Sequence, residues 1–134
     1  MIIPRGGKSL IEKIQKDSKI PVLSHLDGLC HTFIDNKANK NMSIDIALNA
    51  KMRRTGICGA TETLLCHKEA SKTILPDIID ILLKNGCEIR GDKKVQTLNN
   101  RVKPADELDW HTEYLDSIIS IKIVNDMHDA IHHI

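Results

Sequence analysis

The clearest pattern of apolar positions lies between residues 71 and 83. Apolar side chains recur there at spacings of three and four, which places them on one stripe of a helix. The members of this stripe are Ile74, Leu75, Ile78, Ile79, Leu82 and Leu83. Asn85 and Gly86 follow directly, and such a pair is typical of a helix C-terminus. The pattern predicts a structural helix over residues 71–83.

Shorter patterns predict the other helices. Ser9 and Glu12 have the spacing of a capping box, which predicts a helix that buries Leu10, Ile11 and Ile14. Helical spacing recurs in residues 41–51 through Ile44, Ala47, Leu48 and Lys51. Asp126 is expected to cap a final helix that ends near Ile134. Pro104 is expected to open one more helical turn.

Strands are predicted where branched apolar residues cluster or alternate with polar ones. Such stretches occupy residues 20–23, 30–34, 61–67, 88–90 and 117–124. The first two are expected to pair in a sheet through a turn at Asp27-Gly28, and residues 91–101 are expected to be polar and mobile. Strands that alternate with helices indicate an α/β fold with mainly parallel pairing.

Charge and composition narrow the classes of partner. Nineteen Lys and Arg residues against eighteen Asp and Glu residues give a net charge of +1, which argues against nucleic acid as a partner. No apolar run approaches the ~20 residues of a membrane helix, and the N-terminus lacks the apolar core of a signal peptide. Four irregularly spaced cysteines suit reduced thiols. We therefore expect a cytoplasmic protein without a membrane partner.

Cys58 is the main candidate for chemistry. It lies between Gly56 and Gly59, with Arg53 and Arg54 upstream. Cationic side chains lower the pKa of a thiol, and glycines let a substrate carbonyl approach the sulfur. This arrangement suits acyl transfer by a nucleophilic thiol. The alternative is a cysteine packed in the core, which is common for this residue type.

Two further motifs have a functional and a structural interpretation. Arg5, Gly6 and Gly7 precede a predicted helix, so the turn either holds an anion at the helix N-terminus or is a plain connection. Glu62 either acts as a base or orients the cysteine loop through hydrogen bonds.

The seven histidines predict no metal site. His128 and His132 lie one helical turn apart without a third ligand, which favours an exposed helix end over a metal site. A thiol-protease pair of Cys58 with His31, His67 or His111 has the right residue types, but the flanking signatures of those proteases are missing.

The segment from residue 49 to residue 65 resembles the active-site signature of the gamma-glutamyl phosphate reductase family, in the aldehyde dehydrogenase superfamily. That signature reads approximately N-A-K-x-Q-R-P-G-x-C-N-A-x-E-T-L-L. The matching positions are Asn49, Ala50, Lys51, Arg54, Gly56, Cys58, Ala60 and Glu62 to Leu65. Further stretches resemble the family in the same order: residues 3–7, 20–22, 27–31, 88–92, 109–115 and 130–134. The resemblance covers essentially the whole chain.

The resemblance implies an aldehyde dehydrogenase-like α/β fold that is incomplete. Residues 1–50 would be the end of the cofactor-binding domain, and residues 51–134 the first part of the catalytic domain with the cysteine loop. It also implies NADPH as the cofactor, with Arg5, Gly6 and Gly7 on the cofactor side of a site that this chain does not complete.

The implied reaction converts gamma-glutamyl phosphate to glutamate 5-semialdehyde on the route to proline. Cys58 would attack the acyl carbon, phosphate would leave, and hydride from NADPH would reduce the thioacyl intermediate. Arg54 and Arg53 are candidates for binding the phosphate or carboxylate of the substrate, because a guanidinium group suits both anions. Asn49 and Glu62 stand at family positions that would support the site.

Three departures from the signature lie beside the cysteine. Arg53 replaces Gln, Thr55 replaces Pro, and Gly59 replaces Asn, so we expect a relaxed site. Three hypotheses remain open. The chain is part of an enzyme that works with a separately encoded complementary chain, an inactive remnant of a reductase, or a non-enzymatic interaction domain.

Overall fold

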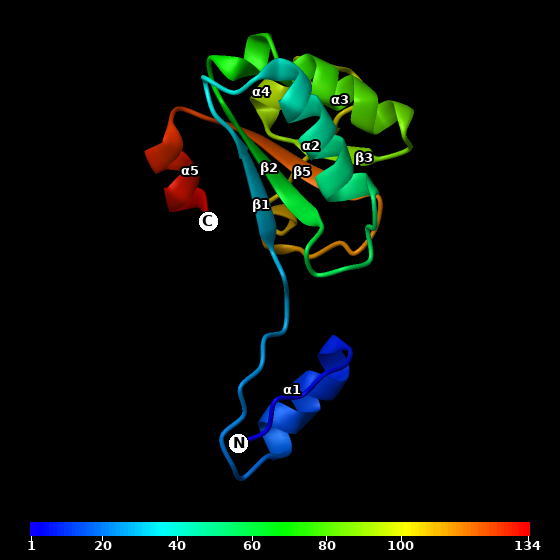
Figure 1. The fold of residues 1–134 in the computed structure, drawn as a ribbon, viewed down its shortest axis with the longest axis vertical. Coiled ribbons are helices and arrows are strands. Elements are labelled where there is room, and N and C mark those ends of the chain that lie inside the picture. Colours follow the sequence, from blue (N-terminus) through cyan, green and yellow to red (C-terminus); the bar gives the residue numbers. More distant parts are fainter.

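The computed structural model describes all 134 residues, and a parallel five-stranded sheet forms its centre (Figure 1). The strand order is β1-β2-β5-β3-β4, and every pair is parallel. The strands are β1 (Cys30–Ile34), β2 (Thr61–His67), β3 (Glu88–Gly91), β4 (Lys103–Pro104) and β5 (Ile118–Val124). The predicted α/β class with parallel pairing is confirmed.

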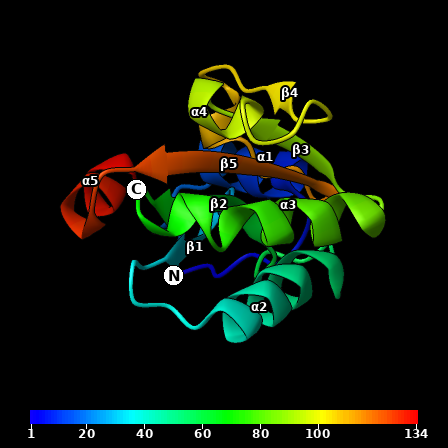
Figure 2. The same ribbon diagram turned by 90° about the horizontal axis from the view of Figure 1, so that it is seen from above.

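The main core lies between this sheet and two helices, α2 (Lys40–Met52) and α3 (Leu75–Lys84) (Figures 1 and 2). The predicted stripe of α3 faces the sheet, and its fully buried members are Leu75, Ile78, Ile79 and Leu82. Each such side chain contributes roughly 1.5–3 kcal/mol by leaving water. Every residue of β2 is buried, which agrees with a central parallel strand covered on both faces.

The opposite face of the sheet is covered near its end by α5 (Met127–His133). Ala130 of this helix packs against Leu65, Val124 and the partly buried Phe33. The predicted cap is confirmed, because the Asp126 side chain accepts a hydrogen bond from the Asp129 backbone N–H.

Residues 1–22 lie apart from the sheet, and an extended linker of residues 23–29 connects them to β1 (Figure 1). They contain α1 (Lys8–Asp17) and a single parallel bridge between Ile2 and Val22. Three predictions for this part are wrong. The cap of α1 is Gly7, without a side-chain hydrogen bond, so Ser9 lies inside the helix and the capping box does not form.

Residues 20–23 do not join the sheet beside residues 30–34. The backbone of Ile2 occupies the pairing groups of this stretch, since its N–H donates to Pro21 and its carbonyl accepts from Leu23. Leu10, predicted to be buried in α1, is about half exposed, and Ile11 is the one buried residue of that helix.

Three other element predictions need correction. Residues 70–72 form the 3-10 helix η1 (Ala70–Lys72), and α3 begins only at Leu75 with Pro76 in its first turn, a position that proline favours. Residues 91–101 are not a mobile polar stretch. Asp92 caps the short helix α4 (Lys93–Gln96), whose Val95 is fully buried.

Pro104 does not open a helical turn but ends the edge strand β4, where its missing N–H costs no sheet hydrogen bond. A second 3-10 helix, η2 (Asp109–His111), precedes β5. The segment from η2 to Leu115 forms part of the candidate site.

Candidate functional site

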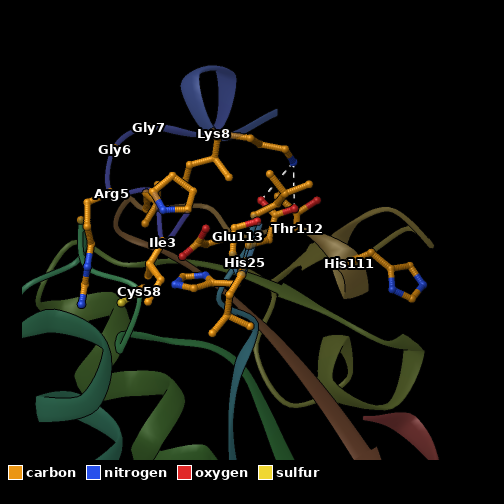
Figure 3. Close-up of a pocket in the computed structure, with 18 residues that line it drawn as sticks. Ile3, Arg5, Gly6, Gly7, Lys8, His25, Cys58, His111, Thr112 and Glu113 are labelled. Carbon is orange, nitrogen blue, oxygen red and sulfur yellow. Dashed lines mark hydrogen bonds and ion pairs between the residues drawn. The ribbon is translucent and has the colours of Figure 1, made fainter. Parts of the chain in front are cut away.

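An open cleft of about 870 Å³ lies between the N-terminal part and the loop that carries Cys58 (Figure 3). Four stretches of chain line it: the turn before α1 with Lys8, residues 23–27 of the linker, Gly56 with Cys58, and the segment after η2. The N-terminal part and the sheet therefore share one cleft.

Cys58 is the one exposed thiol of the four. The loop connects the end of α2 with the start of β2, so the cysteine lies at the N-terminal edge of the central strands. Burial raises the pKa of Cys66 to about 12 and that of Cys87 to about 11, which leaves both as unreactive thiols at neutral pH. Cys30 is half-buried, and its thiol donates to the Cys58 carbonyl oxygen at 3.1 Å.

Three segments meet closely beside Cys58. A Cβ atom placed on Gly28 would lie 2.8 Å from the Cys58 carbonyl oxygen and 3.1 Å from the Cys58 Cβ. The same point lies 3.1 Å from Oε1 of Glu113. The half-buried Glu113 carboxylate is therefore a near neighbour of Cys58, and it has no hydrogen-bond or ion-pair partner within the chain.

Two cationic side chains line the cleft that Cys58 faces. They are Arg5 and Lys8, and the imidazole of His25 and the acidic Asp27 and Glu113 line it too. Lys8 Nζ lies 2.8 Å from Oδ2 of Asp27, and the dashed lines in Figure 3 mark this pair. Arg5 is exposed and has no acidic partner, so its guanidinium group is available to an anionic ligand. The cleft suits a thiol nucleophile and a negatively charged substrate.

The structure brings together only some of the predicted site residues. Arg5, Gly6 and Gly7 line the same cleft as Cys58. Asn49 and Arg53 line a second, shallower cavity of about 480 Å³ at the end of α2. Arg54 is exposed and is not among the residues that line the cleft. The roles given to Arg53, Arg54 and Asn49 stay predictions.

Glu62 forms a buried ion pair with Lys51, which the sequence pattern predicted only as part of a helix. Lys51 Nζ lies 2.7 Å from Glu62 Oε2, and the two side chains are 0% and 1% exposed. The other carboxylate oxygen, Oε1, accepts a hydrogen bond from the Leu115 backbone N–H at 3.3 Å. Leu115 has a φ of +52°, a left-handed conformation that side chains disfavour. Glu62 thus fixes the position of the segment after η2, which forms part of the cleft wall beside Cys58.

A second polar network connects the same segment to β3 and β5. The Tyr114 hydroxyl donates to Oδ1 of Asp109 at 2.8 Å and lies 2.7 Å from the Ser120 hydroxyl on β5. Arg90 Nη1 donates to the same Asp109 oxygen at 2.6 Å. Burial opposes ionisation of Asp109, but hydrogen bonds from the Asp106 backbone, Arg90 and Tyr114 outweigh it and lower the pKa of that carboxyl. Hydrogen bonds and an ion pair therefore fix this part of the cleft wall to the sheet.

The burial of Lys51 could have been predicted from the sequence. Lys51 follows Ser43 and Ala47 at intervals of four, and all three are buried in α2. Asp109, Tyr114 and Ser120 have no such spacing, since the fold brings them together from a loop and a strand. His25 and Glu113 were also missed, because only the fold places them beside Cys58.

The thiol-protease pairs find little support in the geometry. His67 is buried at the far end of β2, and Nδ1 of the half-buried His31 faces the Leu29 carbonyl oxygen at 2.7 Å. His111 lines the cleft but points away from Cys58 (Figure 3). No three His, Cys, Asp or Glu side chains gather in a way that would hold a metal ion. No helix has the length and apolar composition that a membrane crossing requires.

Comparison with known proteins gives a consistent result over the whole chain. The chain is 51% identical to the gamma-glutamyl phosphate reductase of Rhodospirillum rubrum over 134 residues, which is 100% of this chain and 31% of that protein. The crystal structure of the gamma-glutamyl phosphate reductase from Thermotoga maritima matches with a TM-score of 0.93 and 44% identity, over 98% of this chain and 32% of that one. No protein-family model matches the chain.

More distant structures show the fold alone. The betaine aldehyde dehydrogenase from Staphylococcus aureus, solved in complex with NAD+, matches with a TM-score of 0.70 and 13% identity, over 98% of this chain and 36% of that one. The predicted aldehyde dehydrogenase-like fold is confirmed. The chain spans about a third of the length of the relatives it matches.

Proposed function

We propose that this chain carries the nucleophilic cysteine of gamma-glutamyl phosphate reductase chemistry. Its whole length matches about a third of the length of such reductases. The observation that supports it most directly is Cys58 itself, the one exposed thiol, which faces a cleft lined with cationic groups. A buried structural cysteine would have neither property.

In the proposed reaction the Cys58 thiolate attacks the acyl carbon of gamma-glutamyl phosphate. A carbon–sulfur bond forms, the carbon–oxygen bond to phosphate breaks, and a thioacyl group remains on Cys58. Arg5 in the cleft is suited to the phosphate or the carboxylate of the substrate. Arg53 and Arg54 are further candidates for the same anions if the loop closes over the substrate.

The Gly6-Gly7 turn is suited to the phosphates of NADPH. A Cβ atom on Gly7 would meet nothing within 4 Å, and no side chain caps the N-terminus of α1. NADPH, when bound, supplies the hydride that reduces the thioacyl group to glutamate 5-semialdehyde. We place residues 1–50 in the cofactor-binding part and residues 51–134 in the catalytic part. In this chain β1 of the first part pairs with β2 of the second, and α2 packs beside α3.

Acylation of the purified chain tests the proposal without cofactor. Acetyl phosphate, a simple acyl phosphate, should acylate Cys58 and release inorganic phosphate, and peptide mass spectrometry locates the adduct. Cys58→Ser should abolish the adduct, whereas Cys87→Ser should leave it unchanged because Cys87 is buried. Equal acylation of Cys30 and Cys58 would contradict an activated nucleophile at position 58.

Turnover is a separate question, because the chain spans about a third of its relatives. We propose that reduction needs the remaining parts of such an enzyme, supplied by a complementary chain, in the cytoplasm where free cysteines persist. NADPH oxidation should be absent with the chain alone and appear when those parts are added. Acylation of Cys58 without restored turnover would favour an inactive remnant.

A further inference from the structure

His25 lies in the linker between α1 and β1 and lines the cleft with Cys58. Its exposed imidazole extends toward the cysteine, whereas that of His111 points away (Figure 3). Neither nitrogen of His25 has a hydrogen-bond partner within the chain, so both are free to act in the cleft. The histidine that extends toward the cysteine is therefore unpaired and accessible from the cleft.

Residues on both sides of His25 make contacts that connect the linker to other segments. On one side, Gln15 Nε2 donates to the Ser24 hydroxyl at 2.6 Å. On the other side, Asp27 is paired with Lys8, and Gly28 lies directly against the Cys58 carbonyl. The segment that carries His25 therefore contacts the cysteine loop only three residues further on.

The chemistry of the cleft favours an imidazole as the proton acceptor. An ordinary thiol has a pKa of about 8.5, an imidazole about 6.5 and a glutamate about 4.3, so imidazole is the closer match for a thiol at neutral pH. Four other charged groups face this space, namely Arg5, Lys8, Asp27 and Glu113. Arg5 and Lys8 are cations that cannot accept a proton, and Asp27 is occupied by Lys8.

We propose that His25 accepts the proton of the Cys58 thiol and delivers it to the departing phosphate, a role that rests on the proposed function of Cys58. The proton moves from sulfur to an imidazole nitrogen as the carbon–sulfur bond forms. It then moves from the imidazolium to the phosphate oxygen as the carbon–oxygen bond breaks. An acyl phosphate dianion and a thiol thus become a thioester and hydrogen phosphate, and His25 returns to its neutral form.

The pH profile of Cys58 alkylation tests this role in the full chain. Iodoacetamide reacts with the thiolate, and peptide mass spectrometry gives the rate at Cys58 between pH 5.5 and 9. His25→Gln, which cannot accept the proton, should lower the rate at pH 7 at least about fivefold and move the profile toward that of a free cysteine. His111→Gln, from the same cleft, is the matched control and should leave the profile unchanged. His25 is exposed, so circular dichroism of the variant should match that of the parent chain.

The outcomes separate His25 from the proposed function. If acetyl phosphate acylates Cys58 in the parent chain but His25→Gln keeps the parent pH profile, the role of His25 is wrong and the nucleophile stands. If Glu113→Gln slows alkylation and His25→Gln does not, Glu113 is the acceptor and the proposal is overturned. If the parent chain is not acylated at all, the proposed function itself fails.

Discussion

Gly28 and Gly59 both lie near Cys58, but their surroundings differ. A side chain on Gly28 would collide with the backbone of the cysteine loop, whereas a side chain on Gly59 would meet nothing within 4 Å. Neither glycine has a positive φ, so the backbone conformation does not require glycine at either position. Gly28 is needed for close approach, and this contact sets the distance between the linker and the thiol.

Gly28→Ala should therefore destabilise the chain and displace the cysteine loop. Because backbone must move to admit the methyl group, we expect a loss of about 1–3 kcal/mol in the free energy of unfolding, measured by urea denaturation. The alkylation rate of Cys58 should change in the same variant. Gly59→Ala is the matched control and should stay within about 0.5 kcal/mol of the parent chain. Equal effects of the two substitutions would show that the contact at Gly28 does not constrain the loop.

The Lys51–Glu62 pair connects three elements of the structure. Lys51 comes from the last turn of α2, Glu62 from the start of β2, and the Leu115 N–H from the cleft wall. Both charges are buried, so each depends on the other for its solvation. Lys51 Nζ also lies 5.9 Å from the centre of the Tyr114 ring, which adds a favourable contact for the cation.

Removal of one partner should cost more than removal of both. Lys51→Met leaves an uncompensated buried carboxylate and should cost about 3–5 kcal/mol, while Lys51→Met with Glu62→Leu should cost less than Lys51→Met alone. Urea denaturation of the single and double variants forms a double-mutant cycle. Lys40→Met, which breaks the exposed Lys40–Asp77 pair, is the control and should cost at most about 1 kcal/mol. Additive effects at Lys51 and Glu62 would rule out the coupling.

His133 of α5 packs edge-on against the rings of His31 and Trp110. Burial, followed by the nearby Lys122, His31 and His111, lowers the pKa of His133 to about 4. In an unfolded chain the same group titrates near pH 6.5, so the unfolded chain binds the proton first as the pH falls. The stability that His133 contributes is fully present above about pH 6.5 and is lost as the pH falls toward 4.

His133→Gln should reduce this pH dependence, because glutamine takes up no proton. The urea midpoint of the parent chain should fall between pH 7.5 and pH 5, and it should fall less in the variant. His132→Gln is the neighbouring control, since His132 is exposed and should leave the slope as in the parent. If the parent and His133→Gln show the same slope, another group carries the acid sensitivity of this window.

The elements that the sequence predicted well are those with a long periodic pattern. β5 and the stripe of α3 repeat apolar residues over several positions, so local sequence and burial agree. α4 and β4 have four and two residues, and they form where Gly91 packs tightly against Val95 and Val102. Such short elements depend on distant contacts. The same holds for the site, where pattern identified Cys58 but only the fold brought His25 and Glu113 to it.

The molecule as a whole consists of a well-buried sheet with its helices and a lightly attached N-terminal part (Figure 1). The first 28 residues bury one side chain, Ile11, whereas β2 is buried throughout. The Lys8–Asp27 pair is exposed and adds little stability. The cleft therefore has one firm wall, which carries Cys58, and one wall of lower local stability, which carries His25.

Hydrogen exchange should reveal this difference directly. Local opening of residues 1–28 breaks few buried contacts, so the amides of α1 should exchange at least about 100-fold faster than those of β2 and β5, which open only with global unfolding. Mass spectrometry of peptic peptides measures both in one experiment, with α3 as a helical control for α1. Added inorganic phosphate should slow exchange in α1 if Arg5 and Lys8 of the N-terminal wall hold an anion against the cysteine loop. Equal protection of α1 and α3 without any anion would show that the N-terminal wall is as firm as the sheet, and that His25 is held beside Cys58 before any substrate binds.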